Sequence, residues 1–126
     1  MASVMIDDLE QEARLCAGFL TSARRLLRER RLRERMFDGT EFGEPAWDIL
    51  LNLYIAHHEG KLVSVSSLCI AAGVPATTAL RWISTMEVRG QLRRHRDPIH
   101  KRRMFMSLSA EALAAMDRYL TSLAAA

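Results

Sequence analysis

Hydrophobic residues recur near both ends of the chain at the spacing of helices that pack along one narrow face. Over residues 7–37 they follow one another at intervals of four and three, which is typical of a helix facing a partner helix; they are Leu9, Ala13, Cys16, Leu20, Ala23 and Leu27. A second helix is expected over residues 44–58, with Pro45 in its first turn. Ser109 is expected to cap a last helix over residues 109–123, in which the apolar residues are Leu113, Met116, Leu120 and Leu123.

Two short helices with a turn between them are expected in the middle of the chain. They cover residues 66–72 and 75–89. Gly73 separates them, and its missing Cβ permits a left-handed turn. Ser64 or Ser66 is expected to cap the first of the two. The arrangement is that of a helix-turn-helix.

Strands are expected on both sides of this helix pair. Residues 62–63 predict a short strand before it. After Gly90, a residue favoured just beyond a helix end, residues 92–96 and 103–108 predict two strands joined by Asp97-Pro98-Ile99-His100. The fold class is therefore mainly α (α+β), a helix-turn-helix followed by a short β-hairpin and enclosed by terminal helices.

The length and charge of the chain sharpen this picture. A chain of 126 residues predicts one domain, residues 1–126. The formal net charge is only +3, but residues 24–37 and residues 91–103 each carry a net +5. Residues 38–60 carry five acidic residues and no Lys or Arg. Concentrated positive charge of this kind attracts polyanions.

Several classes of protein are disfavoured. Two cysteines provide neither a disulfide framework nor a metal-binding spacing, and the acidic N-terminal segment is unlike a secretory signal. The uncharged stretch over residues 62–80 has the length of a membrane span, but Gly73 and Pro75 break it. We therefore expect a cytoplasmic, nucleoid-associated protein that does not enter a membrane.

No catalytic arrangement is evident, so the chain is not expected to be an enzyme or to need a cofactor. The sequence has no Ser-His-Asp order, glycine-rich phosphate loop or paired carboxylates. His57-His58-Glu59 could suggest metal ligands, but adjacent helical side chains point in different directions. A polar helix end is the better interpretation, and no metal site is expected.

The helix over residues 75–89 can present its outer face in two ways. If Ala79, Trp82, Ile83 and Met86 face inward, the exposed residues are Thr77, Thr78, Arg81 and Ser84. If Leu80 replaces Trp82 in the core, the exposed residues are Thr78, Arg81, Trp82 and Thr85. Threonine hydroxyls and an arginine fork suit base edges and phosphates. The candidate DNA-reading residues are Thr77, Thr78, Arg81, Trp82 and Thr85.

The hairpin over residues 93–103 reads RRHRDPIHKRR and holds six Lys or Arg residues. Alone, such a run is more often a solvated turn. Directly after a helix-turn-helix, it favours a wing that lies on phosphates and in a minor groove. The candidate residues of the wing are Arg94, Arg96, Lys101, Arg102 and Arg103.

The segment from Leu68 to Leu108 resembles the winged helix-turn-helix of MarR-type bacterial transcription regulators. The matching residues are Gly73-Val74, Thr78-Ala79, Arg81, Ile83, Met86, Gly90, Arg102 and Leu108-Ser109. Where that family has Asp-x-Arg in the wing, this chain has His100-Lys101-Arg102, and Asp97 is the nearest carboxylate.

The resemblance implies a dimeric, sequence-specific regulator of transcription that binds double-stranded DNA through residues 61–108. The helix over residues 75–89 would lie in the major groove and the wing on the backbone or minor groove. The terminal helices, residues 7–37 and 109–123, would form the dimer interface through Leu9, Cys16, Leu20, Leu113, Leu120 and Leu123. A small-molecule effector of unknown identity is a possible partner.

Alternatives remain at the level of sequence. A non-specific DNA-compacting protein, or a winged helix that docks an acidic protein, would carry the same basic patch. Cys16 is interpreted as a packing residue of the helix seam, against a thiol that senses hydroperoxides. The arginines of residues 24–37 favour a solvated face with i,i+4 pairs such as Arg25–Glu29 and Arg30–Glu34, against an extra ridge that contacts phosphates.

Overall fold

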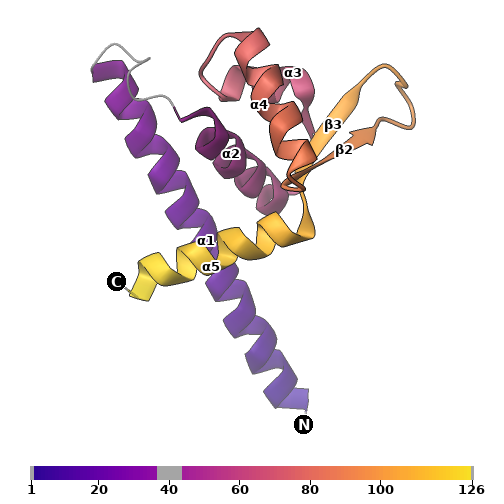
Figure 1. Cartoon of the computed structure of the whole chain (residues 1–126). Coiled ribbons are helices and arrows are strands. Elements are labelled where there is room, and N and C mark those ends of the chain that lie inside the picture. The colour runs from indigo at the N-terminus through magenta and orange to yellow at the C-terminus, as the bar shows by residue number, and fades with distance from the viewer. Residues whose placement is uncertain (1, 37–43, 126) are drawn as a thin grey trace.

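The computed structural model describes residues 2–36 and 44–125, and Figure 1 shows their arrangement. The elements are α1 (Ala2–Met36), α2 (Pro45–Glu59), β1 (Val63–Ser64), α3 (Val65–Ala71), α4 (Ala76–Val88), β2 (Leu92–Arg96), β3 (Met104–Leu108) and α5 (Ala110–Ala125). The mainly α fold class and the order of elements are confirmed. The helix α1 begins at Ala2 rather than at residue 7, because Ala, Met and Ile in the first turns are compatible with a helix. The predicted end of this helix at residue 37 lies outside the described residues.

The three strands form one small antiparallel sheet in the order β1-β3-β2. The hairpin pairs Leu92 with Leu108 at its base and Arg96 with Met104 near its tip. The short strand β1 pairs with the other edge of β3, Val63 facing Met106. The sheet therefore ties the start of the helix-turn-helix to the hairpin that follows it.

The turns and helix caps around the helix-turn-helix use the residues predicted for them. Gly73 and Gly90 have φ of 70° and 76°, a left-handed conformation that glycine adopts without a Cβ clash. Of the two serines considered as caps, Ser64 is the one used, since its Oγ accepts a hydrogen bond from Ser67 N at 3.1 Å. Ser109 caps α5 in the same way, accepting from Ala112 N at 3.1 Å.

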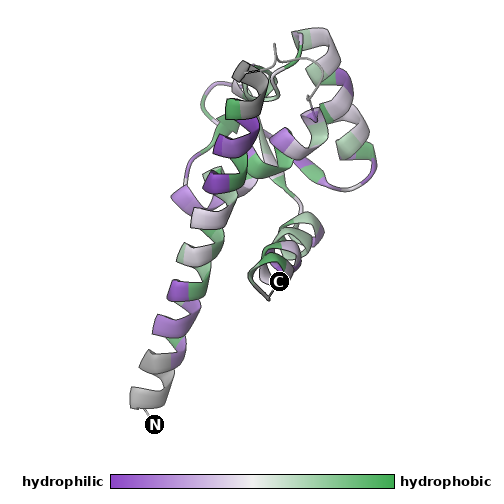
Figure 2. Ribbon diagram, turned by 90° about the vertical axis from the view of Figure 1, so that its left-hand side faces the viewer, coloured by the Kyte–Doolittle hydropathy of each residue, from purple (hydrophilic) through white to green (hydrophobic). Residues whose placement is uncertain are grey.

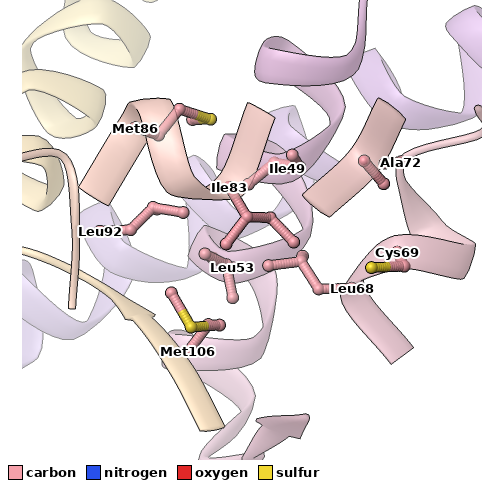
Figure 3. Close-up of a cluster of buried hydrophobic side chains, with 10 residues drawn as sticks. Ile49, Leu53, Leu68, Cys69, Ala72, Ile83, Met86, Leu92 and Met106 are labelled. Carbon is pink, nitrogen blue, oxygen red and sulfur yellow. The ribbon is translucent and has the colours of Figure 1, made fainter. Parts of the chain in front are cut away.

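The first hydrophobic core lies under the helix-turn-helix (Figure 3). Side chains from α2, α3, α4 and the sheet meet there, and the buried members are Ile49, Leu53, Leu68, Cys69, Ala72, Ala79, Ile83, Met86, Leu92 and Met106. Cys69 is 8% exposed, so this thiol is a small packing residue of the core. This core fixes the direction of α4 relative to the hairpin.

A second core joins the terminal helices to α2, and Figure 1 shows α5 crossing α1. Its buried members are Ala23 of α1, Leu51 and Tyr54 of α2, and Met116 and Leu120 of α5. Tyr54 also donates a hydrogen bond from its hydroxyl to Asp117 Oδ1 at 2.7 Å. Burial, together with this bond, raises the pKa of Tyr54. The two terminal helices thus pack against each other within one chain.

The N-terminal half of α1 extends away from the rest of the chain, as Figures 1 and 2 show. Residues 8–18 are all exposed, and burial begins at Phe19. Leu9 and Leu15 are 62% and 53% exposed. No helix of the described residues has the length and apolar character to cross a membrane.

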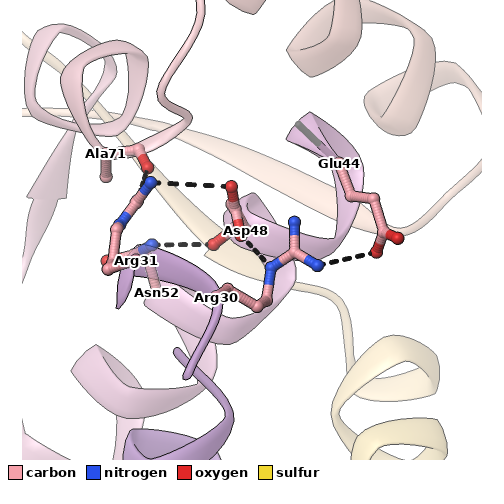
Figure 4. Close-up of polar contacts among 6 residues, drawn as sticks. All are labelled: Arg30, Arg31, Glu44, Asp48, Asn52 and Ala71. Atoms are coloured by element: carbon pink, nitrogen blue, oxygen red, sulfur yellow. Dashed lines mark hydrogen bonds and ion pairs between the residues drawn. The ribbon is translucent and has the colours of Figure 1, made fainter. Parts of the chain in front are cut away.

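A group of polar contacts joins the C-terminal part of α1 to α2 and α3 (Figure 4). Arg30 is 6% exposed; its Nε lies 2.6 Å from Asp48 Oδ1 and its Nη1 lies 2.9 Å from Glu44. Arg31 donates to the carbonyl oxygen of Ala71 at the end of α3, and its Nη1 lies 3.7 Å from Asp48 Oδ2.

The prediction of a solvated arginine face is therefore wrong for Arg30. It pairs across to α2, because α2 places a fully buried carboxylate, Asp48, beside it. The side chain of Glu34 lies outside the described residues, so the pair Arg30–Glu34 stays a prediction. The predicted pair Arg25–Glu29 is confirmed at 3.1 Å. Arg30 and Arg31 contribute to internal contacts, so they are not part of a free basic ridge.

Candidate nucleic-acid interface

The helix α4 adopts the first of the two orientations considered from sequence. Ala79, Ile83 and Met86 are buried, and Trp82 packs half-buried against the first core. The opposite side of α4 is exposed, and its members are Thr77, Leu80, Arg81, Ser84 and Val88. They follow one another at helical spacing, so they form one continuous face, here called the outer face of α4.

Three candidates on α4 differ from the expected exposure. Trp82 lies against the core instead of on the outer face, because the aromatic ring fills the space beside Ile83. Thr78 and Thr85 are half-buried, and Thr85 donates its hydroxyl to the carbonyl oxygen of Arg81 at 3.0 Å. Thr77 and Arg81 are the two sequence candidates that the outer face fully exposes.

Sequence reasoning missed Leu80 as a member of this face. Its side chain is 44% exposed and lies at the edge of this face, on the other side of Thr77 from Arg81. The signal was present, since placing Trp82 inward turns Leu80 outward, but a large apolar residue is normally assigned to the core.

The wing carries all its cations on exposed positions. They are Arg93, Arg94, Arg96, Lys101, Arg102 and Arg103. Arg94 differs from the others because it also bonds to the preceding helix, α4.

Arg94 connects the wing to α4. Its Nε and Nη2 both donate to Glu87 Oε1, at 3.1 and 2.7 Å. These hydrogen bonds raise the pKa of Arg94. The side chain is 32% exposed, and the Glu87 carboxylate offsets its charge. Arg94 is thus exposed like the other cations of the wing, but it is already paired.

The tip of the wing is held by Asp97. Its carboxylate accepts a hydrogen bond from Ile99 N at 2.8 Å. This bond, then a second from the amide of His100, holds the pKa of Asp97 below its ordinary value. At the base of the tip, Asp97 N donates a hydrogen bond to Arg103 O at 3.0 Å and so joins the two sides of the hairpin. Asp97 thus stiffens the tip through backbone amides, where an Asp–Arg pair was considered from sequence.

A polar groove of about 620 Å³ runs between the wing and the start of α3. Ser66 and Ser67 line one side, and Arg102 and Arg103 line the other. Both serines are exposed, and hydroxyls of this kind commonly bond to phosphate oxygens. Sequence reasoning considered Ser66 only as a helix cap and did not name Ser67.

The predicted interface residues of the terminal helices fall into a group that packs within the chain and a group that is exposed. Leu120 is 1% exposed and lies in the second core with half-buried Leu113, so both pack within their own chain. Leu20 is half-buried, and Cys16 is exposed. The exposed leucines of α1 and α5 are Leu9 and Leu123, and also Leu15 and Leu32, which sequence reasoning did not name.

His57 and His58 lie at the end of α2, where their rings make aromatic contacts. The ring of His58 lies 4.5 Å from that of Tyr54 and 5.1 Å from that of His57. Burial, then the neighbouring His57, lowers the pKa of His58. Within the described part of the chain, no three His, Cys, Asp or Glu side chains come together as metal ligands would.

Comparisons with known proteins identify the fold. No protein-family model and no curated protein sequence matches the chain. Among solved structures, S. aureus MepR in its DNA-binding conformation aligns over 96% of this chain and 75% of its own, with 15% identity and a TM-score of 0.54. The PcaV transcriptional regulator from Streptomyces coelicolor, in complex with its natural ligand, aligns over 79% and 67%, with 25% identity and a TM-score of 0.51.

A third structure, the heme sensor protein PefR from Streptococcus agalactiae in complex with heme, aligns over 96% of this chain and 71% of its own, with 14% identity and a TM-score of 0.52. All three are MarR-type regulators. The chain therefore has the winged helix-turn-helix fold of MarR-type regulators, and the resemblance noted in the sequence is confirmed at the level of the fold.

Proposed function

We propose that the protein is a sequence-specific, DNA-binding regulator of transcription that acts as a homodimer. The observation that carries this proposal is the outer face of α4, which presents Thr77, Arg81 and Ser84 to solvent beside a hairpin rich in cations. A helix of this kind enters a major groove, and the neighbouring hairpin then meets the backbone or minor groove.

The two parts of this surface have different tasks. Arg81 has the fork geometry that reads guanine O6 and N7, and Thr77 adds a hydroxyl beside it. The cations of the wing, Arg96, Lys101, Arg102 and Arg103, supply charge against phosphates, which gives affinity without sequence preference. Arg94 has a supporting task, since its bond to Glu87 keeps the wing at a fixed angle to α4.

The proposal of a homodimer is supported by α1. The N-terminal half of α1 extends away from the rest of the chain, and Leu9 and Leu15 on it are more than half exposed. Exposed apolar surface of this kind is unfavourable for a lone subunit. A second copy that packs on this half of α1 and on Leu123 of α5 would cover these side chains. Two copies related by a two-fold axis would also place two α4 helices on successive major grooves.

Selection of random duplexes by the purified protein, read by sequencing, tests this function. We expect enrichment of a site with two symmetric halves whose centres are one helical turn apart, about 10 base pairs. Retention of all duplexes alike would show a non-specific DNA-compacting protein. Retention of none would show that the basic surface meets a different partner, such as an acidic protein. An effector remains a prediction from the resemblance; the ligand and the heme named above are those of PcaV and PefR.

A further inference from the structure

Leu80 places a large apolar side chain beside the polar residues Thr77, Arg81 and Ser84 of the outer face of α4. With 3.6 residues per turn, Thr77, Leu80, Arg81 and Ser84 fall within an arc of about 100° on α4. Leu80 is 44% exposed although the first core lies on the other side of the same helix. A polar residue at this position would make the protein more soluble. The exposed leucine therefore indicates that this face contacts a partner.

The apolar surface continues onto the neighbouring helix. Ile70 of α3 is 83% exposed, and Ile70 and Leu80 line one shallow groove of about 390 Å³. Its remaining lining residues are Val65, Ser66, Cys69, Val74 and Ala76. The groove is mostly apolar, and Leu80 lies both on its wall and at the edge of the outer face of α4.

The charge around this groove defines its partner. Residues 76–103 hold eight Lys or Arg and only two carboxylates. Both carboxylates already accept hydrogen bonds within the chain, Glu87 from Arg94 and Asp97 from the amide of Ile99. The surface therefore suits a polyanion that also carries apolar groups. Duplex DNA is such a partner, because thymine presents its C5 methyl group in the major groove and no other base presents an apolar group there.

We infer that Leu80 contacts the C5 methyl group of a thymine and selects thymine at one position of each half-site. The inference rests on the proposed binding of DNA and adds to it a residue that determines specificity. Leu80 then discriminates by apolar contact, and its neighbour Arg81 discriminates by hydrogen bonds to an adjacent base.

Single replacement of thymine by uracil tests this inference, because uracil lacks only the methyl group. Each thymine of the selected site is replaced in turn, and the Kd is measured by fluorescence anisotropy for the wild type, Leu80→Ala and Val88→Ala. At one position, uracil is expected to weaken the wild type about fourfold for each half-site, the factor for burying one methyl group. Leu80→Ala should bind thymine and uracil at that position equally.

Val88→Ala is the matched control, since Val88 lies on the same helix, is 89% exposed and loses a similar apolar group. It should keep the discrimination at the position that depends on Leu80. If Leu80→Ala loses its helical circular dichroism signal, Leu80→Gln, which keeps the length of the side chain, takes its place.

Two results would overturn the inference and leave the proposed function standing. One is specific binding in which no uracil weakens the wild type. The other is an equal loss for the wild type and the Leu80 variant, which would show that another residue reads the methyl group. Failure of the wild type to bind any duplex would remove the proposed function and this inference together.

Discussion

Arg30 Nε of α1 lies 2.6 Å from Asp48 Oδ1 of α2, and both side chains are almost completely buried, at 7% and 0% exposure. The pair fixes the angle between the long terminal helix and the helix that supports the helix-turn-helix. Arg31 extends the contact to the last turn of α3 through the carbonyl oxygen of Ala71. Through these contacts, the C-terminal part of α1 has a fixed position relative to the helix-turn-helix.

Asp48→Ala is therefore expected to destabilise the fold strongly. Removing one partner leaves the other charge buried, and such losses are about 3–5 kcal/mol. Urea unfolding followed by circular dichroism, at one fixed protein concentration, measures the change in the free energy of unfolding. The control is Glu29→Ala, which removes the exposed pair with Arg25 and should cost under about 1 kcal/mol. Equal losses for the two variants would show that Asp48 has no special structural role.

Glu87 restrains a cation of the wing, so Glu87→Ala should strengthen binding to every duplex. The substitution removes a negative charge and frees Arg94 to reach a phosphate. One added phosphate contact steepens the slope of log affinity against log salt by about 0.9. Salt titrations of the variant and the wild type measure this slope. Glu10→Ala, the same change on the N-terminal half of α1, is the control; if it has the same effect, net charge alone explains the gain.

Arg81→Ala should reduce discrimination between bases. Loss of a bidentate contact to guanine is expected to cost about 1–3 kcal/mol on the selected site and much less on random DNA. Competition between the two duplexes gives both values in one experiment. A similar loss on both would assign Arg81 to the phosphate-binding group, and it would favour the non-specific alternative.

The exposed leucines of α1 should hold the dimer together. Leu9→Glu with Leu15→Glu places charges where a partner helix is proposed, so the variant should sediment as a monomer at micromolar concentration and bind DNA weakly. Leu62→Glu is the matched control, because Leu62 is 77% exposed and lies outside the terminal helices. A monomeric wild type would contradict the proposal. Leu120 is unsuitable for this test, since it is buried in its own chain.

The elements could be predicted from sequence because their signals are local. The spacing of apolar residues, the left-handed Gly73 and Gly90 and the cap at Ser109 each depend on a few neighbouring residues, and the structure has them where they were expected. The edges of the elements moved by one or two residues except at the start of α1, where no local stop signal precedes Asp7.

The contacts between elements could not be predicted in the same way. Arg30 and Asp48 are 18 residues apart, and their meeting depends on the angle between two helices. The orientation of α4 depended on whether Leu80 or Trp82 was buried, and both are large and apolar. A stripe such as that of α5 predicts a packed face, but it does not distinguish the chain's own core from a partner subunit.

The wing offers the most direct test of DNA binding. Lys101 and Arg102 are exposed near its tip, which Asp97 holds in place through the amide of Ile99. If both side chains lie on phosphates, changing both to Ala should flatten the slope of log affinity against log salt by somewhat under two units, since each contact contributes about 0.9. All duplexes should weaken by similar factors, and the selected site should remain preferred.

The matched control for this double variant is Arg14→Ala with Arg25→Ala, which removes the same charge from exposed positions of α1. Its slope should stay close to that of the wild type, because both residues belong to α1, which lies apart from the hairpin β2–β3 (Figure 1). Thermal stability should hardly change in either variant, since the side chains are exposed and bury little surface. A slope for Lys101→Ala with Arg102→Ala that equals the wild-type slope would show that the tip touches no DNA, and the basic hairpin would then be a solvated turn.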